Sequence, residues 1–154
     1  MKLLAFAMGN AVRADDGAGR EMARGLEEIL PGVEILEVQE LLPEHAEKAA
    51  EADGVLFLDA SVEGKPGEVR VTGLAPKVAR AAVIHALTPE EILGLASALH
   101  GRVPPAALVT VSGRDFAWGE TLSAEVRAAL PLAREKAREA AAAFARKPGP
   151  ARVF

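Results

Sequence analysis

The sequence contains no cysteine, and this absence excludes several kinds of chemistry at once. Without thiols, the 154-residue chain has no disulfides, no thiolate nucleophile and no thiolate metal ligands. A nucleophile or metal ligand must therefore be a carboxylate, an imidazole, a hydroxyl group or a water molecule. Asn10 is the only asparagine and Gln39 the only glutamine, and this scarcity of heat-labile side chains is typical of a thermophile.

Two further absences narrow the class of protein. No apolar run approaches the length needed to span a membrane, and the net charge of −4 leaves no basic patch for nucleic acid. The start of the chain leads directly into a predicted strand rather than into a signal peptide, so we expect a cytoplasmic protein. Since 50% of the residues are hydrophobic, the chain should be globular. We expect a monomer with one α/β domain over residues 1–147 and a C-terminal tail over residues 148–154.

Predicted strands and helices alternate along the chain. Apolar runs of strand length lie at residues 3–8, 33–38, 55–58, 68–72 and 106–111. Helical patterns lie at residues 16–30, 43–52, 88–100 and from 122 onwards, with Pro131 expected to break or restart the last of them. The connection before residues 68–72 is too short for a crossover helix, so this strand should pair antiparallel, at an edge of a mostly parallel sheet. The pattern predicts an α/β fold.

The most informative stretch follows the first predicted strand and reads Gly9-Asn10-Ala11-Val12-Arg13-Ala14-Asp15-Asp16-Gly17-Ala18-Gly19. In open α/β sheets, ligands and catalysis gather at such a strand-to-helix connection. One aspartate can cap the helix that follows, which leaves the other as a free carboxylate in the crevice. The alternative is that both aspartates serve only the cap and the turn. The spacing of the glycines matches neither a P-loop nor a dinucleotide-binding loop.

Two other connections contain candidate functional residues. Asp59 directly follows a continuous apolar strand, where it either faces the same crevice as Asp16 or caps the next turn. His85 precedes a helix that begins with a capping box, and it is either functional or a hydrogen-bonded structural residue. Two carboxylates and an imidazole suit a divalent transition metal with open coordination positions, or general acid–base chemistry on a water molecule. His45 and Trp118 are expected to have structural roles, on a solvated helix surface and in a packing lid respectively.

In order and spacing, these motifs resemble those of the hydrogenase maturation proteases. The likeness is carried by Gly9-Asn10 with the segment 15–19, by Leu58-Asp59-Ala60 with Gly64 and Pro66-Gly67-Glu68-Val69, and by His85 with the helix-starting segment after it. The resemblance implies a five-stranded sheet flanked by helices. The expected fold is therefore a three-layer α/β/α arrangement, with a five-stranded mixed, mostly parallel sheet and helices on both faces.

The resemblance also implies an activity. Proteases of this family remove a C-terminal extension from the large-subunit precursor of nickel–iron hydrogenase after nickel insertion. The residues matching Asp16, Asp59 and His85 are associated with recognising nickel, which the substrate supplies, and no organic cofactor is implied. Water would attack the peptide bond, aided by the metal or by an aspartate. The implied partner is the hydrogenase large-subunit precursor.

Two other functions are compatible with the same residues. The first is a metallochaperone-like protein that binds metal through Asp16, Asp59 and His85 without cleaving anything. The second is a non-catalytic α/β interaction domain in which the aspartates cap helices and the histidine is structural. Metal binding without cleavage would indicate the first, and loss of stability in all three single variants without metal binding would indicate the second.

Overall fold

The computed structural model describes residues 1–79, 86–144 and 152–153. Its sheet has the strand order β2-β1-β3-β5-β4-β6. The strands are β1 (Leu3–Met8), β2 (Glu34–Val38), β3 (Gly54–Ser61), β4 (Val69–Gly73), β5 (Ala106–Ser112) and β6 (Arg152–Val153). Strands β2, β1, β3 and β5 are parallel, and β4 pairs antiparallel with β5 and with the two-residue β6. The five predicted strands and the antiparallel pairing of β4 are confirmed, but the prediction that β4 is an edge strand was wrong, because β6 pairs with its outer side.

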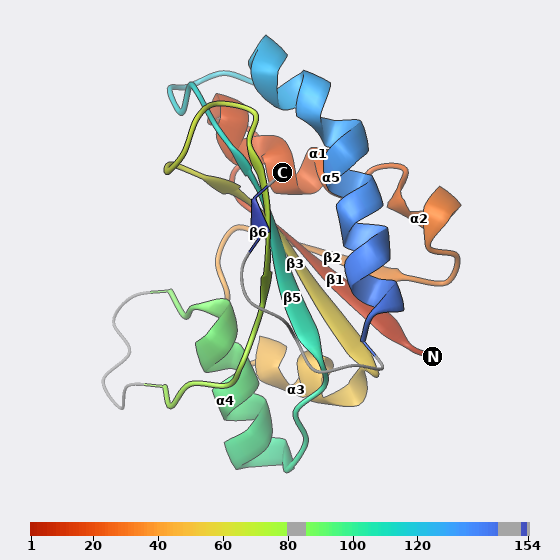
Figure 1. Ribbon diagram of the computed structural model, residues 1–154. Coiled ribbons are helices and arrows are strands. Elements are labelled where there is room, and N and C mark those ends of the chain that lie inside the picture. Colours follow the sequence, from red (N-terminus) through yellow and green to blue (C-terminus); the bar gives the residue numbers. More distant parts are fainter. Residues whose placement is uncertain (80–85, 145–151, 154) are drawn as a thin grey trace.

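Helices cover both faces of this sheet, which confirms the three-layer fold (Figure 1). They are the 3-10 helix η1 (Ala14–Gly17), α1 (Ala18–Ala23), α2 (Leu26–Ile29), α3 (His45–Glu51), α4 (Pro89–His100) and α5 (Ala124–Ala142). Helices α1, α2 and α5 pack on one face, and α3 and α4 pack on the other. In the described part of the chain, no helix combines the length and the apolar character needed to cross a membrane.

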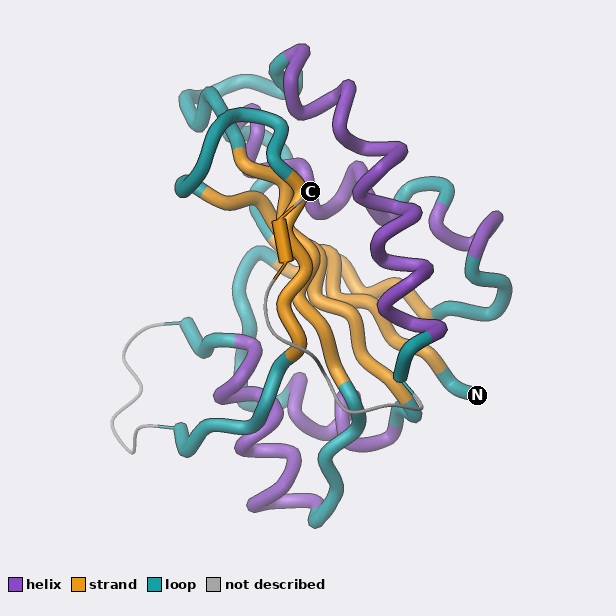
Figure 2. Tube along the Cα trace, viewed as in Figure 1, coloured by secondary structure: helices purple, strands orange, loops and turns teal. Residues whose placement is uncertain are grey.

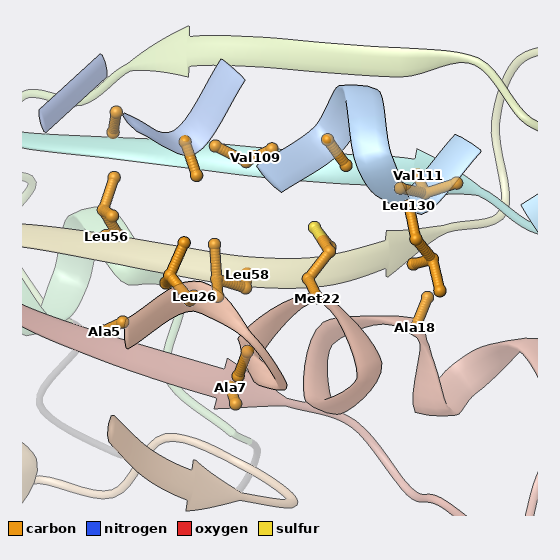
Figure 3. Packing of buried hydrophobic residues seen from close by; sticks show 14 of the residues in the cluster. Ala5, Ala7, Ala18, Met22, Leu26, Leu56, Leu58, Val109, Val111 and Leu130 are labelled. Carbon is orange, nitrogen blue, oxygen red and sulfur yellow. The ribbon is translucent and has the colours of Figure 1, made fainter. Parts of the chain in front are cut away.

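Strand β3 lies at the centre of the sheet and explains why its sequence shows no polar alternation. Residues 55–58 are completely buried because both faces of the strand are covered. Leu56 and Leu58 face the layer of α1 and α5, whereas Val55 and Phe57 face the layer of α3 and α4. In Figure 3, Met22 of α1 lies among Leu58, Val111 and Leu130 in the first of these two cores. The two cores fix the register of β1, β3 and β5, and hence the positions of their ends.

The prediction of one continuous helix over residues 16–30 was wrong. Arg24 is extended and Gly25 has a φ of 79°, a left-handed conformation that glycine adopts without strain. The chain therefore forms η1, α1 and α2 in place of one helix. Leu26 of α2 is still fully buried, so the break redirects the chain without losing the apolar contact.

The prediction that Pro131 breaks the last helix was also wrong. Helix α5 continues through Pro131, with Leu130 and Ala133 buried on its inner side. A proline removes one N–H donor and leaves the carbonyl of the residue four positions earlier, here Arg127, without its usual helical partner. Both Pro131 and Arg127 are exposed, so water can solvate that carbonyl. The apolar contacts along the inner side keep the helix continuous.

The predicted start of α4 is confirmed in detail. The Thr88 hydroxyl accepts a hydrogen bond from the backbone N–H of Glu91 at 3.2 Å, and the Glu91 carboxylate accepts one from the backbone N–H of Thr88 at 3.0 Å. Pro89 occupies the first turn, where its missing N–H is not needed. This capping box fixes the position at which the chain enters α4 after the segment 80–85.

Candidate active site

The candidate site lies at the edge of the sheet where the parallel strands β1, β3 and β5 end. Strand β1 leads into the segment 9–17, β3 ends near Asp59, and β5 leads into the loop before α5. Figure 2 shows these three connections at the same end of the sheet, opposite the N-terminus. Strands β1 and β3 are neighbours, with Ala7 beside Leu58. The topology thus brings the first and second sequence motifs together.

A set of local hydrogen bonds holds the segment 9–17 in a compact turn. The Asp16 carboxylate accepts a hydrogen bond from the backbone N–H of Asn10 at 2.8 Å. The Asn10 side-chain oxygen accepts one from the backbone N–H of Val12 at 3.1 Å, an Asx turn that gives the only asparagine a specific role. The Arg20 side chain of α1 donates to the carbonyl of Gly9 at 3.1 Å. Asp16 is therefore partly exposed but held in place.

Gly9 allows this turn to close. It has a φ of 110°, and a Cβ atom there would overlap the carbonyl oxygen of Asp16. We expect Gly9→Ala to lower the free energy of unfolding by about 2 to 4 kcal/mol, because strain and a backbone collision combine. Gly32→Ala is the matched control: Gly32 also has a positive φ, 85°, but no atom lies within 4 Å of the added Cβ. Urea unfolding should show a clearly larger loss for Gly9→Ala, and equal losses would contradict the tight turn.

Asp15 is a structural anchor rather than a helix cap. Its side chain is fully buried and accepts hydrogen bonds from three backbone N–H groups of the β5–α5 loop. These donors are Arg114 at 2.7 Å, Asp115 at 2.9 Å and Ser123 at 2.7 Å. Burial alone would raise the pKa of Asp15, but the hydrogen bonds from Ser123, Asp115 and Arg114 outweigh it and lower the pKa. Neither η1 nor α1 has a side-chain cap, so the expectation that one aspartate caps the helix was wrong.

Asp59 lies at the end of β3, where it is mostly buried. Burial raises the pKa of Asp59 from 3.8 to about 6, although a hydrogen bond from the backbone N–H of Ala60 opposes this effect. The negative charge of Asp16 raises the pKa of Asp59 further. The two carboxylates are therefore electrostatically coupled, so a cation that binds both would relieve their repulsion. Of the predicted residues, the structure brings Asp16 and Asp59 together at one edge.

The third predicted site residue, His85, lies outside the residues that the structure describes. Among the described residues, no group of three or more histidine, aspartate or glutamate side chains is arranged to hold a metal ion. The complete set of Asp16, Asp59 and His85 therefore stays a prediction. Leu87 and the start of α4 are described, and the backbone N–H of Leu87 donates to the carbonyl of Leu41 at 3.2 Å.

Two side chains that the sequence analysis treated as structural have different surroundings from those expected. His45 is half-buried rather than solvated; its ring meets that of Phe6 edge-on, and its Nδ1 accepts a hydrogen bond from the backbone N–H of Leu42 at 2.9 Å. Trp118 is 75% exposed, so it does not pack as an internal lid. Phe116 of the same loop is partly buried and packs close to Gly113. His45 is still structural, whereas Trp118 presents most of its ring to solvent.

The fold and the site together indicate a class of protein. Coupled carboxylates at the carboxyl ends of adjacent parallel strands are typical of α/β enzymes that bind a cation or handle protons. No family model matches the sequence, and no curated protein matches it. Several solved structures do, over most of the chain.

Several of these solved structures are named as hydrogenase maturation proteases. HybD from Thermococcus kodakarensis is 26% identical, with a TM-score of 0.68 over 90% of this chain and 98% of the other. The hydrogenase maturating endopeptidase HybD from E. coli is 25% identical, with a TM-score of 0.70 over 97% of this chain and 98% of the other. HycI from Thermococcus kodakarensis is 24% identical and matches the fold with a TM-score of 0.69, over 90% of this chain and 91% of the other. The predicted resemblance is confirmed, and the comparisons support a hydrolase of the protease class.

Proposed function

We propose that this protein is an endopeptidase that removes the C-terminal extension of a nickel–iron hydrogenase large-subunit precursor after nickel insertion. In this proposal Asp16, Asp59 and His85 recognise the nickel ion that the precursor carries. The observation that carries the proposal is the pairing of Asp16 with Asp59, since the charge of one raises the pKa of the other. The named peptidases of similar fold supply the reaction class.

The electrostatics of the two carboxylates suit a site that is completed by its substrate. Without a cation, Asp59 is mostly protonated below its pKa of about 6 and mostly ionised above it. A nickel ion would favour the charged form of Asp59 and displace its proton. The site would thus bind a metal-loaded precursor more tightly than an empty one. Such discrimination ensures that cleavage follows nickel insertion.

Water is the nucleophile in this proposal, because the chain has no cysteine and no Gly-x-Ser-x-Gly motif that would mark a serine nucleophile. Either the substrate-held nickel or an aspartate would help to remove a proton from that water. Asp59 has a suitable pKa for this task when it is not engaged with the metal. The imidazole of His85 would supply the nitrogen ligand that borderline metals such as nickel accept alongside carboxylates.

The test is a cleavage assay with a hydrogenase large-subunit precursor, prepared both with and without nickel. We expect the intact protein to shorten only the nickel-loaded precursor, with mass spectrometry identifying the released C-terminal peptide. Nickel or cadmium binding to the purified protein, followed by anomalous scattering from soaked crystals, tests the ligands separately. Binding at Asp16, Asp59 and His85 without cleavage would replace the peptidase by a metallochaperone-like function. The absence of both would favour a structural interaction domain.

A further inference from the structure

An exposed aromatic side chain lies beside the candidate site. Trp118 is the only tryptophan of the chain, and 75% of its surface is exposed. The guanidinium carbon of Arg13 lies 5.4 Å from the centre of the indole ring, within the range of a cation–π contact. Val12, next to Arg13, is also 40% exposed. Together, Trp118, Arg13 and Val12 form an exposed patch, called here the tryptophan patch.

Backbone hydrogen bonds join the tryptophan patch to the turn that contains Asp16. The N–H of Ala14 donates to the carbonyl of Gly119 at 2.7 Å, and the N–H of Gly119 donates to the carbonyl of Val12 at 2.9 Å. Asp15 strengthens this junction through its bonds to Arg114 and Asp115 in the same loop. The patch is therefore held at a fixed place relative to Asp16. Because the backbone of the loop is already ordered, a partner that covers Trp118 does not have to order the loop first.

The backbone is strained at Ala14, next to the tryptophan patch. Ala14 has a φ of 48°, and among the described residues it is the only one other than glycine with a positive φ. This conformation costs alanine about 1 kcal/mol or more, so the surrounding hydrogen bonds must maintain it. Ala14 lies between Arg13, whose guanidinium faces the indole ring, and Asp15, which is buried. The strained residue thus turns the chain from the anchor to the surface.

The charge of the patch indicates what it binds. None of the ion pairs among the described residues includes Arg13. The nearby Arg114, by contrast, is paired with Glu125 at 3.2 Å. Tryptophan and arginine are the residue types that contribute most to protein–protein contacts. An apolar surface with an unpaired cation complements a polypeptide segment that presents an apolar side chain and a carboxylate.

We propose that Trp118 and Arg13 form a docking contact for the polypeptide substrate, outside the metal-recognising carboxylates. An apolar side chain of the substrate packs on the indole, and a substrate carboxylate pairs with the Arg13 guanidinium. This inference rests on the proposed function, because it takes the cleaved precursor as the occupant. Docking here positions the substrate relative to Asp16 through the shared turn.

The test separates binding from catalysis. Trp118→Ala should raise KM for the nickel-loaded precursor at least about tenfold and leave kcat unchanged within about twofold. Arg13→Glu should raise KM more than Arg13→Ala, since it turns attraction into repulsion. Trp118→Phe should restore most of the affinity because it retains an apolar ring. Calorimetric titration with the same precursor should give parallel changes in Kd.

Leu99→Ala is the matched control. Leu99 is 65% exposed but belongs to α4, which covers the other face of the sheet, so this variant should keep the wild-type KM. Unchanged KM and Kd in Trp118→Ala, or an equal rise in Leu99→Ala, would overturn the docking contact while wild-type cleavage still supported the proposed function. Failure of the wild-type protein to cleave would count against the proposed function. The calorimetric titration would then decide on the docking contact by itself.

Discussion

Replacing either Asp16 or Asp59 with asparagine is expected to reduce precursor cleavage by at least about 100-fold. Asparagine keeps the shape of aspartate but removes the negative charge that a nickel ion requires. The protein should nevertheless stay folded, because each asparagine retains an oxygen that can accept the hydrogen bond now made to Asp16 or Asp59. Both variants should also lose affinity for nickel, which can be measured by calorimetry on the purified protein.

For Asp59→Asn, loss of activity should be accompanied by a gain in stability. Because the pKa of Asp59 is raised from 3.8 to about 6 in the folded state, ionising this carboxylate destabilises the fold. The destabilisation is absent well below pH 3.8, grows as the pH rises from 3.8 to about 6 and is complete above pH 6. Near pH 7.5, the asparagine variant should therefore be more stable than the wild type by about 1 to 3 kcal/mol. At pH 4 most of this difference should disappear, because Asp59 is then protonated in the folded protein.

Asp53→Asn is the matched control for the measurements of cleavage and of nickel affinity. Asp53 is exposed, pairs with Arg102 at 2.8 Å and lies at the opposite end of β3 from Asp59. The same chemical change there should leave cleavage and nickel affinity unaltered. If Asp59→Asn cleaved the precursor at the wild-type rate, the assignment of Asp59 to the site would be wrong. If it were less stable than the wild type at pH 7.5, the raised pKa would be wrong.

The neighbouring residue, Asp15, should respond in a different way. Asp15→Ala leaves three backbone N–H groups near the buried position without their acceptor, and we expect the free energy of unfolding to fall by about 3 to 5 kcal/mol. Asp15→Asn should lose less, because one amide oxygen can still accept two of the three bonds. Urea unfolding, monitored by circular dichroism, measures both losses.

Asp16→Asn is the internal control for Asp15, since it alters the adjacent residue. Its free energy of unfolding should change by less than about 1 kcal/mol, because Asp16 is partly exposed and its single hydrogen bond can be kept. In the wild type, the stability contributed by Asp15 should be present above pH 4 and lost as the pH falls through its lowered pKa. If Asp15→Ala and Asp16→Asn lowered the free energy of unfolding equally, the assignment of a structural role to Asp15 and a functional role to Asp16 would be wrong.

The pair of aspartates shows where sequence analysis reaches its limit. The motif Asp15-Asp16-Gly17 left two interpretations open: one aspartate capping the helix and the other free, or both serving only the cap and the turn. The partners of Asp15 lie 99, 100 and 108 residues further along the chain, so no local pattern could reveal them. The exposure of Trp118 was hidden for the same reason, because the contact between its loop and the segment 12–14 joins distant parts of the chain.

Structural features that depend on residues close together in the sequence could be predicted from the sequence. The apolar run 55–58 predicted a central strand covered on both faces, and the capping box at Thr88 predicted where α4 begins. The errors concern helix continuity: the break at Gly25 and the continuation through Pro131 depend on how each segment packs against the sheet. The cost of placing a proline inside a helix is a few kcal/mol, and a helix that buries enough apolar surface along its inner side overcomes it.

The sequence by itself determined the α/β fold, the resemblance to hydrogenase maturation proteases and the residues Asp16, Asp59 and His85 as candidates. Only the tertiary structure decided that Asp15 is the anchor, that Asp16 and Asp59 are coupled and that Trp118 faces solvent beside them. The division has a physical cause. Strand and helix patterns arise from contacts within a few residues, whereas burial, charge coupling and pKa depend on groups that only the folded chain brings together.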